Sequence, residues 1–332
     1  MNSSDKGVHE KAPLLSQPVV AVPYVGNANV AVAGEPIQYD MHRIEVRVAE
    51  VEDFLAPEVP GIMIRERMFP WQVFCGVCEK QSQFKVANVP PVLVEDPEDE
   101  YFTSQPASFQ VREQSECFQR YCCHQMRHLR LGMFPVGGSM QTQGEAPGWP
   151  GSMRPSLVME KPLRVPLVCC CFMLCPPEMN VVRPTSASLN YGNTPNIPVD
   201  GEYFGRIVCD WKWWNCFYPC ETYMNVLDEK DEVQYILHRA DGCGAGCRNC
   251  CAPSCFQRTH RTFIKTPSGQ KVGEMQNIWP GWNVRGLCQG NSAADNFILD
   301  FPADSDYRQK SLLMGGLFLA NYVFWERRAN QK

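Results

Sequence analysis

The pattern of hydrophobic and polar positions sets one stretch near the C-terminus apart from the rest of the chain. Between Lys310 and Glu326, fifteen consecutive residues carry no charge, and ten of them are large apolar or aromatic side chains. These side chains fall on every face of a 3.6-residue helix, which predicts a helix buried all round. At about 1.5 Å per residue the stretch reaches ~22 Å, less than the ~30 Å hydrocarbon core of a bilayer. We therefore predict a central core helix over 308–326, with a transmembrane anchor as the alternative.

Three residues interrupt the apolar character of this helix. Gly315 and Gly316 each cost about 1 kcal/mol in helix propensity, which predicts the close approach of another backbone. Asn321 is the one strongly polar side chain in the stretch. A buried amide without a partner costs ~1–3 kcal/mol, so we expect Asn321 to hydrogen-bond to a surrounding element of the core.

Upstream of the helix, short segments rich in Ile, Val, Phe and Trp alternate with turn residues. The predicted extended segments are Ile62–Arg67, Trp71–Val77, Phe84–Ala87, Tyr101–Val111, His128–Leu131 and Leu157–Arg164. Two polar or Gly/Pro-rich stretches, Pro135–Pro155 and Val181–Pro198, are predicted to be surface loops. Many short strands separated by turns favour an antiparallel barrel or sandwich over βαβ units.

A short pattern that occurs twice extends this interpretation. Gly201-x3-Gly205-x5-Trp211 recurs as Gly269-x3-Gly273-x5-Trp279, which suggests a duplicated β-structure around the helix. A closed barrel would keep the apolar helix out of water. The fold class we predict is mainly β, a closed antiparallel barrel with a helix in its lumen. Residues 1–54 lack a hydrophobic period and are predicted to be a mobile tail. The barrel domain is expected over 55–328, with a short C-terminal tail at 329–332.

Composition excludes several classes of function. Of the 332 residues, 44% are hydrophobic and 20% charged, with a formal net charge of −5 and no run of Lys or Arg. An acidic chain of this kind argues against nucleic-acid binding and against docking on anionic lipid by charge alone. A nucleophile elbow, a phosphate-binding loop, an H-E-x-x-H motif and a dinucleotide fingerprint are all missing, so a classical enzyme is not expected.

The chain contains eighteen cysteines, and no cleavable signal peptide is expected, which indicates a reducing compartment. Cys169, Cys170, Cys171 and Cys175 are clustered beside apolar residues. Three adjacent cysteines on a strand cannot all face one metal, because successive side chains point to opposite faces. The cluster suits S-acylation, since two or more acyl chains anchor a protein stably to a membrane. Unmodified core thiols are the alternative.

A second group of cysteines has spacing that could hold a metal. Cys247-x-x-Cys250 is followed by Cys255 and His260, and two thiols spaced in this way bind one tetrahedral ion. These four side chains are candidate ligands of Zn²⁺. The alternative is that the cysteines are ordinary buried thiols.

Several ordered motifs together give the chain a family resemblance. They are FCGVCEKQSQFKV from Phe74 to Val86, E-x-S-x-C-x4-CC from Glu113 to Cys123, EKPLR from Glu160 to Arg164, V-G at Val272-Gly273, Trp279, and ADNF from Ala294 to Phe297. With FP at Phe301-Pro302 and the apolar segment after Lys310, the chain resembles the phospholipid scramblases from about Gly61 to Arg328.

The resemblance implies a Tubby-like fold, in which about twelve strands close around a central C-terminal helix. It also implies covalent palmitate at the cluster of Cys169, Cys170, Cys171 and Cys175. Membrane phospholipids would be the partners, and no nucleic acid is expected. The protein would be lipid-anchored at the cytoplasmic face of the plasma membrane or of an endomembrane.

In this family an acidic segment before the helix is taken to bind calcium. Here that segment offers Asp295, Asn296, Asp300, Asp304 and Asp306, and Ca²⁺ takes six to eight oxygen ligands. The family usually begins with Asp where this chain has Ala293, so one candidate ligand is missing. The alternative is an acidic turn in which an Asp caps the helix.

Two hypotheses of function follow. The first is a calcium-stimulated, bidirectional and non-selective movement of phospholipids between membrane leaflets, without covalent catalysis. The second is a palmitoylated membrane-surface adaptor that binds lipid or protein and does not move lipid. A spanning C-terminal helix would favour the first hypothesis, and a buried helix the second.

Overall fold

The computed structural model describes the strands, the helices and some of the connections of one barrel unit. The described residues are 51–67, 81–89, 97–115, 127–136, 155–163, 176–184, 201–210, 221–240, 252–283, 285 and 295–325. Every structural statement below concerns these residues.

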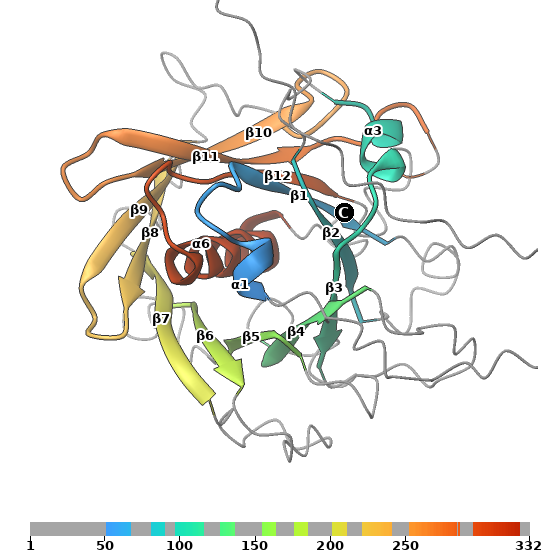
Figure 1. Cartoon of the computed structure of the whole chain (residues 1–332). Helices are drawn as coiled ribbons and strands as arrows, with labels where there is room; N and C mark the ends of the chain where they lie inside the picture. The colour runs from blue at the N-terminus through green and yellow to red at the C-terminus, as the bar shows by residue number, and fades with distance from the viewer. Residues whose placement is uncertain are drawn as a thin grey trace, which may run out of the picture. The chain divides into compact units, whose positions relative to one another are not determined.

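Twelve strands form a closed antiparallel barrel in which each strand pairs with its neighbours in chain order, and β1 pairs with β12 to close it (Figure 1). The strands are β1 Gly61–Glu66, β2 Gln83–Asn88, β3 Phe109–Gln114, β4 Leu129–Pro135, β5 Leu157–Lys161, β6 Glu178–Pro184, β7 Gly201–Asp210, β8 Glu221–Asp228, β9 Val233–Ala240, β10 Thr259–Lys265, β11 Lys271–Ile278 and β12 Asn296–Asp300. The predicted fold class, a closed antiparallel β-barrel, is confirmed.

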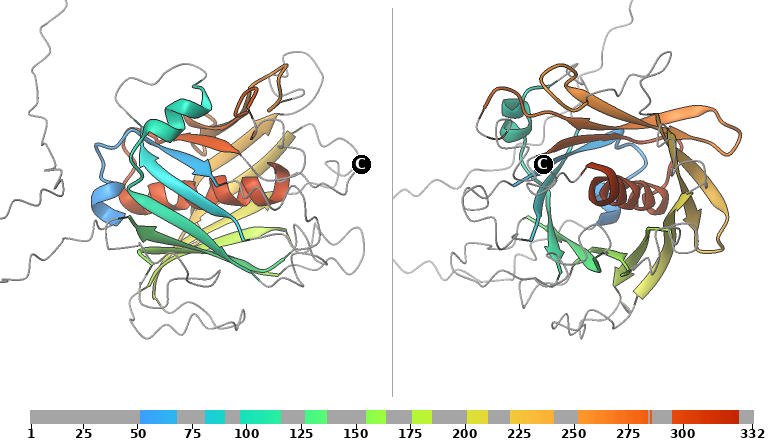
Figure 2. Two further views of the ribbon diagram at one scale, coloured as in Figure 1. Left: turned by 90° about the vertical axis from the view of Figure 1, so that its right-hand side faces the viewer. Right: turned by 180° about the vertical axis from the view of Figure 1, so that it is seen from behind.

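The predicted helix lies inside this barrel. α6 spans Tyr307–Ala320 and continues as one π-helical segment, η3, over Asn321–Trp325. Lys310 and the ten residues after it are all buried, and the helix runs along the barrel axis (Figures 1 and 2). The helix is therefore a core element, as the all-round apolar pattern predicted. None of the described helices is both long enough and apolar enough to cross a membrane.

The two ends of the barrel are named here by what lies at each. At the α1 end, β1 begins at Gly61, β12 finishes at Asp300, and α6 begins. The Trp325 end contains the last residue of η3, together with Glu66 of β1 and Asn296 of β12. Because all neighbouring strands are antiparallel, Gln114, Lys161, Asp210, Thr259 and Ile278 also lie at the Trp325 end.

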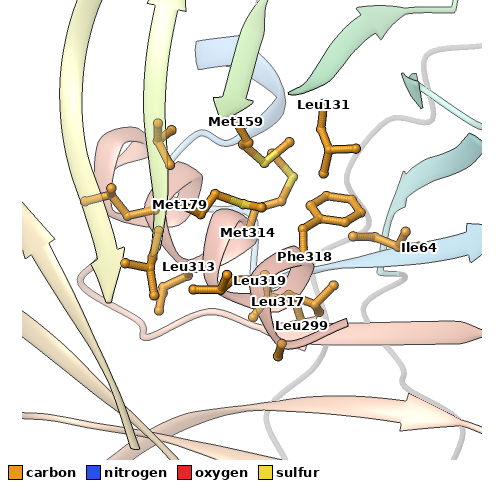
Figure 3. Packing of buried hydrophobic residues seen from close by; sticks show 14 of the residues in the cluster. Ile64, Leu131, Met159, Met179, Leu299, Leu313, Met314, Leu317, Phe318 and Leu319 are labelled. Carbon is orange, nitrogen blue, oxygen red and sulfur yellow. The ribbon is translucent and has the colours of Figure 1, made fainter. Parts of the chain in front are cut away.

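The lumen is filled by side chains from the helix and from alternate positions of the strands. β3 shows this alternation, with Phe109, Val111 and Glu113 buried and the residues between them half-buried. Phe318 of α6 packs edge-on against Phe84 of β2, with ring centroids 5.0 Å apart. Figure 3 shows Met314 of α6 pointing toward Met159 and Met179 on the surrounding strands. The interior is thus one continuous apolar core built around α6.

The two helix glycines make room for strand side chains. A Cβ placed on Gly315 would lie 2.8 Å from Val181 Cγ2, and one on Gly316 would lie 2.6 Å from Leu237 Cδ1. The sequence predicted close approach of another backbone. The structure corrects that detail, because side chains of β6 and β9 occupy the space instead.

The α1 end is closed by the segment that precedes β1. α1, Val51–Phe54, lies there, and Phe54 packs against Phe109 with ring centroids 4.7 Å apart. The ammonium group of buried Lys310 donates hydrogen bonds to the carbonyls of Ala56, Pro57 and Val59 at 2.6, 3.0 and 2.9 Å. Val51 and Phe54 belong to the main core, so the folded unit begins before the predicted boundary at residue 55.

Other details of the predicted elements were wrong. The predicted strand Tyr101–Val111 is instead α3, Asp99–Ser104, followed by β3, because Phe102 turns into a small apolar cluster on the outside of the barrel. The predicted loop at Val181–Pro198 begins within β6, and Trp71–Val77 lies outside the described residues. The two glycine patterns are not equivalent, because Gly201 is the first residue of β7 whereas its counterpart Gly269 lies in the turn before β11.

Candidate functional site

Polar side chains gather at the Trp325 end, where the strands present their last inward-facing residues. Glu66, Glu113 and Lys161 continue the inward alternation of β1, β3 and β5, and each is at most 2% exposed. We call the following set the polar ring: Glu66, Glu113, Arg127, Lys161, Arg239, His260, Asn277 and Asp295. Three acidic and three basic groups make the ring nearly neutral, which lowers the cost of burying its charges.

Glu113 is the best-supported carboxylate of the polar ring. One oxygen accepts hydrogen bonds from Arg127 Nε at 3.3 Å and Ser115 Oγ at 2.5 Å. The other accepts from the Ser82 backbone N–H at 3.0 Å and from the Tyr322 hydroxyl at 3.1 Å. The Arg127 guanidinium also lies 5.1 Å from the centre of the Tyr322 ring. Because Tyr322 belongs to η3, Glu113 ties the last turn of the central helix to the wall of the barrel.

The neighbouring side chains extend this arrangement across β4 and β5. Lys161 Nζ donates to the Arg127 backbone carbonyl at 2.9 Å. Glu160, which precedes it, accepts from His128 Nε2 at 3.0 Å and from Arg130 Nε at 2.9 Å. Burial alone would raise the pKa of Glu160, but the hydrogen bond from His128 and the charge of Arg130 outweigh it and hold the pKa below its usual value.

On the opposite wall, His260 of β10 contacts the end of the helix. Arg239 Nε donates to His260 Nε2 at 3.1 Å, so that nitrogen acts as an acceptor. The His260 ring packs edge-on against Trp325 at 5.5 Å, and Trp325 stacks on Phe297 at 5.7 Å. The aromatic end of η3 therefore fits against β10 and β12.

The π-helical segment carries two buried polar atoms that the described residues leave without partners. Within the part of the chain that the structure describes, Asn321 Oδ1 accepts no hydrogen bond and Trp325 Nε1 donates none. Asn321 Oδ1 therefore makes none of the expected hydrogen bonds to the described strands. π-Helical turns in helices are often found at functional sites, and here η3, which directly follows α6, coincides with the polar ring.

A second polar cluster holds α3 on the outside of the barrel. The buried guanidinium of Arg285 donates to Asn296 Oδ1 at 3.0 Å and to the Glu66 carbonyl at 2.8 Å, and it pairs with Asp99. Asp99 also accepts from Arg65 Nε at 3.2 Å and from Asn296 Nδ2 at 3.1 Å. Burial lowers the pKa of Arg285, while the charge of Asp99 acts in the opposite direction. A buried cation already occupies the position between Asp99 and Asn296.

The predicted zinc ligands are not described as a set. Cys247 and Cys250 lie outside the described residues. Cys255 is exposed in the turn before β10, whereas His260 is 1% exposed and its Nε2 already accepts a hydrogen bond. Among the described residues there is no group of three or more His, Cys, Asp or Glu side chains arranged to hold a metal ion.

Comparison with known proteins links this chain to one family. It is 26% identical to phospholipid scramblase 1 of Rattus norvegicus over 222 residues, which cover 66% of this chain and 50% of the relative. It is 26% identical to phospholipid scramblase 2 of Homo sapiens over 227 residues, 68% of this chain and 57% of the relative. The chain is related to the phospholipid scramblases. It spans about half the length of the curated scramblases that it matches.

No family model matches the sequence. No solved structure matches it either, so the Tubby-like assignment stays a prediction. The relationship to the scramblases gives the polar ring a context, because two of the scramblase-like motifs supply it. Glu113 of the ring comes from the E-x-S-x-C motif, together with its hydrogen-bond partner Ser115, and Lys161 of the ring comes from EKPLR. Motifs separated by more than forty residues in the chain therefore meet at the Trp325 end.

The five scramblase-like calcium candidates are divided between the two ends of the barrel. Asp295 and Asn296 are at the Trp325 end, where Asn296 contacts Arg285. Asp300 is at the other end of β12, about 13 Å along the strand at ~3.3 Å per residue. Ca²⁺ binds oxygens at about 2.3–2.6 Å, so one ion cannot join the two ends of this strand.

The remaining two candidates lie at the start of α6. Asp304 is exposed in the preceding turn. Asp306 is the N-cap of the helix, and its carboxylate accepts from the Gln309 backbone N–H at 2.8 Å. The five residues do not fit a single calcium site. The alternative interpretation, that an Asp caps the helix, is confirmed for Asp306.

The cysteines that the scramblase resemblance assigns to palmitate, Cys169, Cys170, Cys171 and Cys175, lie outside the described residues, in the connection between β5 and β6. Sequence reasoning missed two features of the site. Arg127 and Arg285 lie in no recognised motif, and Arg285 pairs with Asp99 across 186 positions of the chain. No local signal in the sequence could have found that pair.

Proposed function

We propose that this protein moves phospholipids between the leaflets of a membrane without covalent catalysis, and that it is associated with membranes. The observation that carries the proposal is the similarity to phospholipid scramblases 1 and 2 across two thirds of the chain. The convergence of the scramblase-like motifs in the polar ring supports it, because residues of these motifs form one arrangement in the fold.

The position of α6 limits how lipid movement would occur. A phospholipid headgroup meets a penalty of several kcal/mol in hydrocarbon, so the protein must provide a polar route or thin the bilayer locally. After its first turn, the side chains of α6 are buried inside the barrel and offer no surface to lipid. We therefore place the route on the outside of the barrel or at its Trp325 end, with α6 as the support that fixes the barrel's shape.

The adaptor hypothesis shares this geometry, since a buried helix was its expected feature. We propose lipid movement ahead of it because the relatives that are named for that activity match two thirds of this chain. Calcium stimulation is not part of the proposed mechanism, because the five candidate ligands do not meet. Palmitoylation at Cys169, Cys170, Cys171 and Cys175, which would anchor the protein at a cytoplasmic membrane face, is a separate proposal.

The test is lipid movement in proteoliposomes that contain the purified full chain and a trace of fluorescent phospholipid. A membrane-impermeant reductant bleaches the outer leaflet only. We expect bleaching to exceed half of the fluorescence with active protein and to stop near half with heat-denatured protein. Protection of the inner leaflet in every preparation, acylated or not, would reject lipid movement and favour the adaptor.

Calcium is examined in the same assay with calcium and with a chelator. If calcium stimulates lipid movement and both Asp300→Asn and Asp304→Asn abolish this stimulation, those residues would be reinstated as calcium ligands. Stimulation that survives both substitutions would place the ion elsewhere in the chain.

A further inference from the structure

Two turns at the Trp325 end project from neighbouring strands. One turn, 252–258, leads into β10, and the other, 280–283, follows β11. Thr259 of β10 is paired with Ile278 of β11, and the ladder continues with a hydrogen bond from Trp279 N–H to the Arg258 carbonyl at 2.8 Å. The two turns therefore leave the barrel side by side.

Each turn carries one aromatic side chain that is almost fully exposed. Phe256 is 91% exposed and Trp282 is 77% exposed. The other exposed large hydrophobic side chains of the described residues lie between 38% and 45%. Exposed aromatic side chains on two adjacent turns offer apolar surface of the kind that marks an interaction site.

Both aromatics are held in place by their own turns. Phe256 follows Ser254, whose backbone N–H donates to the Gln257 carbonyl at 2.8 Å and so closes the turn. Trp282 packs edge-on against buried Trp279, with ring centroids 5.2 Å apart. The Asn283 side chain donates to the Pro280 carbonyl at 2.9 Å and braces the second turn. The surface is therefore built before any partner arrives.

A cationic side chain, Arg258, belongs to the first turn. Arg258 is half-buried at the base of the first turn, and its buried Nε has no hydrogen-bond partner. Within the described part of the chain no carboxylate pairs with it. A guanidinium in this turn offers an acceptor such as a phosphate oxygen both charge and hydrogen bonds.

We propose that Phe256, Trp282 and Arg258, together called the aromatic tip, dock into the headgroup region of a phospholipid bilayer. Trp and Phe favour this interface, where an apolar ring is buried while polar groups stay hydrated. Half-buried Arg258 supplies positive charge and hydrogen-bond donors for lipid phosphate. The net charge of −5 does not favour docking by charge alone, so the aromatic side chains supply the main attraction.

This inference rests on the membrane association proposed above and adds the surface that makes the contact. It orients the barrel with its Trp325 end, and so with the polar ring, toward the bilayer. Docking does not require lipid movement, so either proposal can fail while the other holds.

The test is partitioning of the full chain onto phosphatidylcholine vesicles that contain some phosphatidylserine, measured by flotation. The protein is produced in bacteria that add no palmitate, which isolates the contribution of the tip. We expect Phe256→Ala and Trp282→Ala each to lower the partition coefficient about tenfold, equivalent to ~1.4 kcal/mol. Arg258→Gln is expected to weaken partitioning by a few-fold and to reduce its dependence on salt.

The matched control is Tyr203→Ala, which removes an exposed aromatic side chain near the α1 end. It should bind vesicles as the wild type does, and all variants should melt at the wild-type temperature. The proposal would be overturned if the Phe256→Ala and Trp282→Ala variants bound vesicles as the wild type does. It would also be overturned if the wild-type protein did not bind vesicles. Loss of a dimer on gel filtration with unchanged vesicle binding would assign the tip to a second copy of the chain instead.

Discussion

Asp300 lies directly opposite Glu274 in the ladder between β12 and β11. Burial and the charge of Glu274 raise the pKa of Asp300 to about 6, while Lys271 and Arg261 act in the opposite direction. The side chain makes no hydrogen bond within the described residues. The ionised form of Asp300 therefore lowers the free energy of unfolding at neutral pH.

This cost predicts how stability depends on pH. The folded-state pKa is raised, so the unfolded chain loses the Asp300 proton first, and stability falls as pH rises from about 4 to about 6. Asp300→Asn should remove that decline and raise the free energy of unfolding at pH 7.5 by about 1–3 kcal/mol. Denaturant titrations at pH 4.5 and 7.5 measure both effects. An Asn variant less stable than the wild type at pH 7.5 would contradict the account.

Glu113 gives the corresponding test of the polar ring. Glu113→Ala leaves buried Arg127 without its carboxylate and should lower the free energy of unfolding by about 3–5 kcal/mol. Glu160→Gln is the matched comparison on β5, because the Glu160 side chain is 16% exposed and water replaces part of what is lost. We expect a loss of about 1 kcal/mol there. Equal losses in the two variants, measured by urea denaturation, would remove the special role of Glu113.

At the scale of single elements, the sequence predicted α6 well because its signal is local. The apolar residues that define it are consecutive, and the predicted 308–326 differs by one residue at each end from the observed 307–325. α3 was missed because Tyr101 and Phe102, which pack in the outer cluster, suit a strand equally well. Its position depends on Asp99, which is held by Arg285 from a remote part of the chain.

The fit of α6 in the lumen can be tested at Gly315. Gly315→Leu would force its side chain against Val181 and Ile207, whose methyl groups lie 2.8 and 3.0 Å from a Cβ at that position. We expect overpacking to cost about 1–3 kcal/mol in the free energy of unfolding. Gly315→Ala should cost less, because its single methyl group is partly offset by a gain of ~1 kcal/mol in helix propensity. A Leu variant as stable as the wild type would show that α6 is not tightly enclosed.

At the scale of the whole molecule, the closed barrel with a helix in its lumen was predicted from an apolar helix and many short strands, and from the scramblase resemblance. The grouping of candidate residues was not predictable in the same way. Asp295 to Asp306 are neighbours in sequence, yet β12 separates the two ends of that segment and α6 uses Asp306 as its cap. Conversely, Glu113, Lys161 and Tyr322 are far apart in the chain and meet at the Trp325 end.

The barrel also orders the functional proposals along one axis. The α1 end is closed by Lys310 and the carbonyls that it binds. The Trp325 end carries the polar ring inside and the aromatic tip outside. Membrane contact at the Trp325 end would therefore leave α6 enclosed and bring the scramblase-like residues closest to lipid.

The central claim is that α6 remains the core of the barrel when the protein is on a membrane. Photo-methionine incorporated in place of methionine gives a direct test, because Met314 lies in the middle of α6 and points toward Met159 and Met179 (Figure 3). After illumination of vesicle-bound protein, the account predicts cross-links between the Met314 peptide and the peptides of β5 or β6. A Met314 peptide linked to phospholipid instead would show that the helix leaves the barrel to face the bilayer, and would contradict the account.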